Sequence, residues 1–133
     1  MADNFERVKE YVLDLGFSID EEIPEEEIVI INDEDRGIHR LVIDCEEDLV
    51  VLEQLILKFE GDVQAAVYRR LLQMNRSLVF GAFVLNEDGD VLLYRNTLAL
   101  DNLDLNELET TINALSLGLA ENGDELLGFV AGE

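Results

Sequence analysis

The chain has 133 residues, of which 48% are hydrophobic and 30% are charged, and its formal net charge at pH 7 is −22. This length and apolar content suffice for one buried core, so we expect a single α+β domain over residues 1–133 rather than a disordered chain. The charge excludes two classes of partner, because 31 acidic side chains against nine basic ones repel nucleic-acid phosphates and anionic lipid headgroups.

The N-terminal half predicts one helix followed by strands. Apolar residues recur at steps of three and four over residues 5–15, which is the spacing of an amphipathic helix. The short β-branched runs Ile28–Ile31 and Ile38–Cys45 predict a hairpin with a long polar turn. Residues 49–59 fit either a helix or a strand, and we predict a strand because a lone hairpin needs a third strand to be stable.

The second half opens with another helix and a second hairpin. Residues 62–75 carry an apolar stripe at helical spacing, and Asp62 is a candidate N-cap. Two apolar runs follow, Leu78–Leu85 and Val91–Leu98, and the Asp88–Gly89 pair between them supplies a hairpin turn.

The last predicted helix starts near Asp104, which forms a capping pair with Glu107. We expect it to end at Asn122–Gly123, with the apolar residues 126–130 packing back as a short tail. The order helix, three strands, helix, two strands, helix predicts a two-layer α+β fold with a five-stranded antiparallel sheet and three helices.

Two of the predicted strands are apolar on both faces. An antiparallel sheet covered by helices on one face should alternate apolar and polar residues, yet residues 49–59 and 78–85 do not. Five or six such side chains left in water would forgo on the order of 10 kcal/mol. The second face therefore needs cover from helices of this chain, from a second copy in a homodimer, or from a client segment, and the sequence leaves these alternatives open.

No residue pattern points to catalysis or to a metal. The single histidine, His39, would lie about 20 Å from the single cysteine, Cys45, along one strand, too far for a nucleophile and its base. The acidic turns near Gly37 and Gly89 lack the ligand spacing of a calcium loop. We therefore expect no catalytic residue, no metal, no cofactor and no enzymatic activity.

Three further features bear on location and partners. Because Cys45 is the only cysteine, no internal disulfide forms, which suits a reducing compartment. Residues 1–9 are charged and do not resemble a signal peptide, and no apolar run reaches the ~18 residues of a membrane helix. We expect a cytoplasmic protein whose partner is a basic or amphipathic protein segment.

The region from Val67 to Leu119 carries a family resemblance. Its matching stretches are the helix end Leu71–Asn75, the strand Gly81–Phe83 and the helix start Leu103–Leu108. They resemble the YbjN-type, or Tir-chaperone-like, branch of the type III secretion chaperone-like family. The resemblance implies the order α-β-β-β-α-β-β-α and small acidic homodimers that hold segments of client proteins.

The resemblance also implies a site, because the dimer contact in such chaperones involves the second helix and a neighbouring strand. The candidate dimer or client surface here comprises Val67, Tyr68, Leu71, Leu78 and Phe80. We expect a non-enzymatic, chaperone-like homodimer. The alternative is a regulatory or structural interaction protein that binds one folded partner.

The basic residues are few and unevenly placed. Arg69, Arg70 and Arg76 fall in or just after the second predicted helix. Such a cluster in an acidic chain fits salt bridges either within the chain or between two copies, and the sequence does not separate the two.

Overall fold

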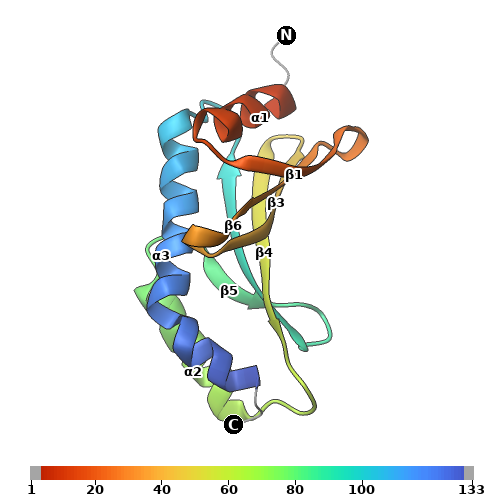
Figure 1. The fold of residues 1–133 in the computed structure, drawn as a ribbon. Coiled ribbons are helices and arrows are strands. Elements are labelled where there is room, and N and C mark those ends of the chain that lie inside the picture. Colours follow the sequence, from red (N-terminus) through yellow and green to blue (C-terminus); the bar gives the residue numbers. More distant parts are fainter. Residues whose placement is uncertain (1–3, 131–133) are drawn as a thin grey trace.

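Residues 4–130 are described by a computed structural model and form three α-helices and six strands (Figure 1). The helices are α1 (Asn4–Asp14), α2 (Ala65–Ser77) and α3 (Leu105–Val130). The strands are β1 (Ser18–Ile23), β2 (Ile28–Asp33), β3 (Ile38–Glu46), β4 (Leu49–Lys58), β5 (Ala82–Leu85) and β6 (Val91–Ala99). Two 3-10 turns, η1 (Pro24–Glu26) and η2 (Glu34–Arg36), join β1 to β2 and β2 to β3.

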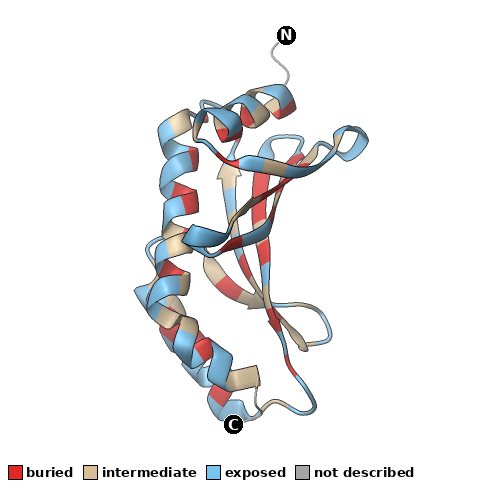
Figure 2. Cartoon of the chain, in the orientation of Figure 1, coloured by how far each residue is buried: buried red, intermediate tan, exposed pale blue. Residues whose placement is uncertain are grey.

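The strands form one antiparallel sheet in the order β1-β2-β3-β4-β6-β5. All three helices lie on the same side of it in Figure 1 and contribute to one continuous apolar core. Figure 2 shows the buried residues along the sides of the helices that face the strands. The molecule is therefore a two-layer α+β structure, as predicted.

Residues 49–59, which fitted either a helix or a strand, contain the central strand β4. It pairs with β3 on one side and with β6 on the other, so it joins the N-terminal and C-terminal strands into one sheet. Its buried residues Val50, Leu52 and Gln54 alternate along the strand, as expected for one face of a sheet. The prediction of a strand is confirmed.

The predicted number of five strands is wrong, because β1 was missed. Its sequence, Ser-Ile-Asp-Glu-Glu-Ile, contains only two apolar residues, and neither Ile19 nor Ile23 is fully buried. β1 lies at the edge of the sheet and pairs with β2 alone. An edge strand needs little apolar content, and charged side chains there are typical because they oppose pairing with other chains.

Three element boundaries also differ from prediction. The strand predicted over residues 78–85 is restricted to β5, because Gly81 has a φ of 76° and interrupts the extended backbone. α2 begins after Gln64 rather than at an Asp62 cap. α3 continues through Asn122–Gly123 to Val130, since the buried Leu126 packs its last turns into the core.

Among residues 4–130, no helix lies on the second face of the sheet (Figure 1), so the helices do not supply its cover. Ile30 and Val51 on this face are only 7% exposed, but they lie outside the main core cluster. Leu55 remains 56% exposed. Of residues 4–130, no helix combines the length and the apolar character needed to cross a membrane.

The predicted capping pair is present at the start of α3, where Glu107 N–H donates to Asp104 Oδ1 at 2.7 Å. We expect Asp104→Ala to lower the free energy of unfolding by about 1 kcal/mol, because one helix donor loses its partner. Asp101→Ala, an exposed neighbour outside the cap, should change it by much less. Urea denaturation measures both, and equal effects would contradict a role for the cap.

A candidate protein-binding surface

The link between α2 and β5 forms an apolar groove with α3. Its one side consists of Leu78, Val79 and Phe80, and its other side includes Ala114 and Leu117 of α3. The groove has a volume of about 220 Å³. Val79 is 74% exposed, Leu117 55% and Phe80 45%, so large apolar side chains meet solvent here. We call this site the 78–80 groove.

The backbone of the link is fixed by hydrogen bonds at both ends. Leu78 N–H donates to the Asn75 carbonyl at 3.2 Å. The Asn75 side chain bonds both backbone groups of Phe83. Asn75 Oδ1 accepts from the Phe83 N–H at 2.7 Å, and Asn75 Nδ2 donates to the Phe83 carbonyl at 3.1 Å. The Tyr94 hydroxyl donates to the Phe80 carbonyl. Val79 and Phe80 are therefore presented on an ordered segment.

Two glycines make this arrangement possible. A Cβ on Gly81 would overlap the Tyr94 hydroxyl, and the positive φ of this residue disfavours any other residue type. A Cβ on Gly118 would lie 2.9 Å from Leu78 Cδ2, so this glycine lets Leu78 approach α3. Burial raises the pKa of Tyr94 to about 12, so its hydroxyl remains a donor even above pH 10.

The structure divides the five residues predicted for the site. Leu78 and Phe80 line the 78–80 groove. Val67 and Leu71 are 7% and 5% exposed and belong to the core, so they are not accessible to a partner. Tyr68 is half-buried and donates its hydroxyl to the Gly89 carbonyl at 3.3 Å, in the turn between β5 and β6.

Three exposed apolar residues were missed by the sequence prediction. Val79 lies in the link, and Leu117 lies on α3 outside its apolar stripe. Leu72, which is 72% exposed, likewise falls outside the buried stripe of α2. A large apolar residue outside an otherwise regular stripe was the available signal in both helices.

The arginines of α2 are used in two ways. Arg70 forms a bidentate salt bridge with Glu125 of α3, with N–O distances of 2.6 and 3.1 Å, and its pKa is raised by these hydrogen bonds. Arg69 and Arg76 are exposed and form no ion pair with any residue between 4 and 130. Both basic groups remain available to a partner.

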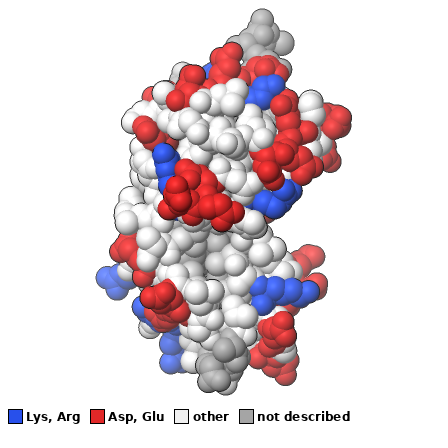
Figure 3. Space-filling view, viewed as in Figure 1, with Lys and Arg blue, Asp and Glu red and all other residues white. Residues whose placement is uncertain are grey.

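A second apolar depression lies between β4 and α3. It has a volume of about 260 Å³, and its walls include Leu55 and Leu57 of β4 and Gly123 and Leu127 of α3. We call it the β4–α3 cleft. Figure 3 shows the molecule hollowed between these elements, with acidic side chains gathered over η2 above the hollow. Leu127 is 71% exposed and Leu55 56%.

The outer face of the sheet has a related hollow of about 380 Å³. It is lined by Val42, Glu53 and Leu93, and it shares His39 and Leu55 with the β4–α3 cleft. Asp44 lies on the same face. Its pKa is raised mainly by burial and, to a smaller extent, by the negative charge of the neighbouring Glu46. The two hollows therefore adjoin each other across the edge of β4.

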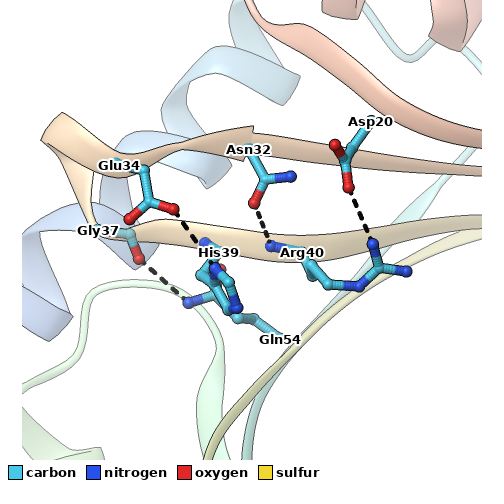
Figure 4. Close-up of polar contacts among 7 residues, drawn as sticks. All are labelled: Asp20, Asn32, Glu34, Gly37, His39, Arg40 and Gln54. Atoms are coloured by element: carbon cyan, nitrogen blue, oxygen red, sulfur yellow. Dashed lines mark hydrogen bonds and ion pairs between the residues drawn. The ribbon is translucent and has the colours of Figure 1, made fainter.

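The side chains that could act in catalysis or bind a metal lie apart from one another. His39 is exposed and lies 3.6 Å from Glu34 across the turn between β2 and β3 (Figure 4), whereas Cys45 is buried on the other face of the sheet. Residues 4–130 contain no group of three or more His, Cys, Asp or Glu side chains placed to hold a metal ion.

The sequence matches a family model, and the fold matches solved structures. A family model described as CesT_Tir_1 matches residues 1–132. No curated protein matches the sequence. Among solved structures, YbjN from E. coli is 12% identical, covers 92% of both chains and has a TM-score of 0.68.

Two further similar structures are complexes. The Yersinia pestis type III secretion chaperone SycH, in complex with a stable fragment of YscM2, is 17% identical, covers 85% of this chain and 93% of its own, and has a TM-score of 0.59. The HopA1–SchA chaperone–effector complex gives 12% identity, coverages of 90% and 97%, and a TM-score of 0.60. At these identities the likeness shows a shared fold.

We expect Tyr94→Phe to lower the free energy of unfolding at pH 7 by about 1–3 kcal/mol, because the Phe80 carbonyl loses its donor. The raised pKa of Tyr94 also sets a pH dependence. Its contribution is complete below the unfolded value near 10 and is lost as pH rises toward about 12. The difference between wild type and variant, measured by urea denaturation at several pH values, should therefore shrink between pH 10 and 12.

Hydrogen exchange provides the control for this variant. Tyr94→Phe should speed the exchange of the amides in residues 78–82, whereas Tyr68→Phe removes an equivalent hydroxyl near Gly89 and should leave them unchanged. Unchanged exchange in Tyr94→Phe would mean that this hydroxyl does not hold the link.

Proposed function

The chain belongs to the CesT_Tir_1 family, and from that premise we propose that it is a non-enzymatic, chaperone-like protein that forms a homodimer and holds segments of client proteins. SycH and SchA, whose folds are similar, are chaperones found in complex with a protein fragment and an effector. The acidic surface of this chain would favour basic clients by steering their approach.

The observation that carries the proposal is the exposed apolar surface of the 78–80 groove. Val79, Phe80 and Leu117 are large side chains that solvent reaches on an ordered backbone. Covering each of them contributes up to roughly 1.5–3 kcal/mol. Such a patch on an otherwise highly charged surface is typical of a protein-binding site.

A second copy of the chain is the occupant that we propose for this groove. The net charge of −22 opposes self-association, so a dimer contact needs local cations. Arg69, Leu72 and Arg76 share one outward face of α2, directly before the link, and Glu121 lines the groove. A two-fold contact that brings these arginines to the partner's acidic residues is self-complementary.

Light scattering at micromolar concentration tests the dimer. We expect about twice the chain mass of 15.0 kDa for the wild type. Val79→Asp and Phe80→Asp should each give the single-chain mass, because a buried unpaired charge costs several kcal/mol. These side chains are exposed in the single chain, so its fold should persist, as circular dichroism can verify.

Leu13→Asp is the matched control for the dimer. Leu13 of α1 is 54% exposed and lies outside the groove, so this variant should keep the wild-type mass. A monomeric wild type, or equal dissociation of all three variants, would contradict a dimer through the 78–80 groove.

Capture from a native lysate tests client binding. With the wild-type chain immobilised, we expect quantitative mass spectrometry to find several unrelated proteins, enriched in basic segments with exposed apolar residues. Leu13→Asp should capture the same set, because its substitution lies away from the apolar surfaces. One partner recovered in equal molar amount would instead support an interaction protein that binds a single folded protein.

A further inference from the structure

The outer face of the sheet carries apolar side chains that do not belong to the core. Ile28 of β2 and Val51 of β4 lie directly beside Asp44 of β3 in the pairing register, and Ile30 lies beside Val42. Residues opposite each other in antiparallel strands share a face of the sheet. The four apolar residues of this set lie outside the core cluster that the helices cover. Asp44 is therefore a carboxylate in an apolar neighbourhood.

The two arginines that flank this neighbourhood are engaged within the chain. Arg40 donates to Asp20 at 2.9 Å and to Glu21 at 3.0 Å, and Figure 4 shows it reaching toward Asp20. Arg95 donates to Glu53 at 2.9 Å. Both guanidinium groups thus have carboxylates of their own, and neither forms an ion pair with the half-buried Asp44.

Asp44 is left as a charge without a counter-ion among residues 4–130. Burial raises its pKa most, the negative charges of Glu46 and Glu26 raise it further, and Arg95 offsets only part of the effect. Because its pKa is higher in the folded chain than in the unfolded chain, the charged form of Asp44 lowers stability. The fold has no use for this charge, whereas the cation of a partner would.

The outer hollow lies next to Asp44. Its apolar walls are Val42, Leu55 and Leu93. Val42 and Asp44 are two positions apart on one face of β3, which places them about 6.6 Å apart along the strand. The face thus offers an apolar socket and an unpaired carboxylate side by side, and this combination fits a partner that carries an apolar and a basic side chain at the same spacing.

The face favours a helix as the partner's secondary structure. β3 pairs with β2 and with β4 from Val42 to Asp44, so its backbone groups are already used. A segment that lies on top of the sheet must therefore satisfy its own backbone groups, as a helix does. Residues i and i+4 of a helix lie about 6 Å apart along its axis, close to the spacing of the socket and the carboxylate.

We propose that the outer face of the sheet docks an amphipathic helix of a client protein, with an arginine or lysine of its apolar stripe on Asp44 and an apolar residue one turn away in the outer hollow. The inference rests on the proposed function and names Asp44 as the residue that selects the client's basic side chain. A second copy is a poorer occupant, because face-to-face stacking would bring together two net charges of −22.

The probe is a labelled, alanine-rich helical peptide of about 18 residues, with leucines at positions i, i+3 and i+7 and an arginine at i+4. One comparison peptide replaces the arginine by citrulline, which is neutral and has the same shape. Another moves the arginine to the polar face and so keeps composition and charge. In fluorescence anisotropy both should bind at least about tenfold more weakly than the parent, since neither places a cation on Asp44.

Two protein variants assign this preference to one carboxylate. Asp44→Asn keeps the shape of the side chain and removes a charge that lowers stability, so the variant should fold and should bind the arginine and citrulline peptides within about twofold of each other. Glu46→Gln removes one charge from an exposed position on the same face of β3 and should keep the tenfold preference. An unchanged preference in Asp44→Asn, or its equal loss in both variants, would overturn the role of Asp44.

The hollow has its own matched pair of variants. Leu55 is 56% exposed in the hollow and Leu13 is 54% exposed on α1. Leu55→Asn should weaken the parent peptide at least about tenfold, and Leu13→Asn should leave it unchanged. Equal affinities of the two variants, or no saturable binding by the wild type, would overturn docking at this face.

Light scattering at saturating peptide separates a client helix from a second copy. The peptide should add to the mass of the wild-type assembly without dividing it. Release of single chains would assign the outer face to the dimer contact and would overturn the inference.

The outcomes also separate this inference from the proposed function. If the peptides show no preference while the dimer and client capture are found, only helix docking at Asp44 is excluded. If the preference is found but the wild type is monomeric and captures no client, the chaperone-like function fails while the helix site stands.

Discussion

The pairing of β4 with two different neighbours determines how the whole molecule is built. β3 carries the N-terminal strands to one side of it and β6 carries the C-terminal strands to the other, so one central strand joins both halves of the sheet. Because β3 separates from it after Glu53, the sheet is continuous at one end of β4 and open at the other. The helices bury one face, while the other face keeps exposed apolar residues such as Leu55.

How far the sequence predicts this structure depends on what each segment buries. The helices and the paired strands have regular apolar spacing, and the capping pair of Asp104 and Glu107 places the start of α3 correctly. β1 escaped prediction because an edge strand is stabilised by backbone pairing and needs few apolar residues. The end of α3 escaped it because burial of Leu126 outweighs the low helix propensity of Gly123. The family resemblance is confirmed over residues 1–132.

The candidate site shows why an apolar stripe is a poor guide to a binding surface. Val67 and Leu71 follow the regular spacing of α2, and that regularity is what places them in the core. The exposed residues Leu72 and Leu117 lie outside the stripes, and Val79 lies in a link without regular structure. Spacing along the chain reports which side of an element is buried, whereas the groove depends on the tertiary contacts of Gly81 and Gly118.

The distribution of charge connects the two apolar surfaces to different kinds of partner. Arg69 and Arg76, which form no ion pair within residues 4–130, lie on α2, the helix that leads into the 78–80 groove, and they suit an acidic surface such as that of a second copy. The β4–α3 cleft lies below the acidic η2 and suits a basic segment. Because the two sites differ in charge preference and lie on separate elements, occupation of one need not exclude the other.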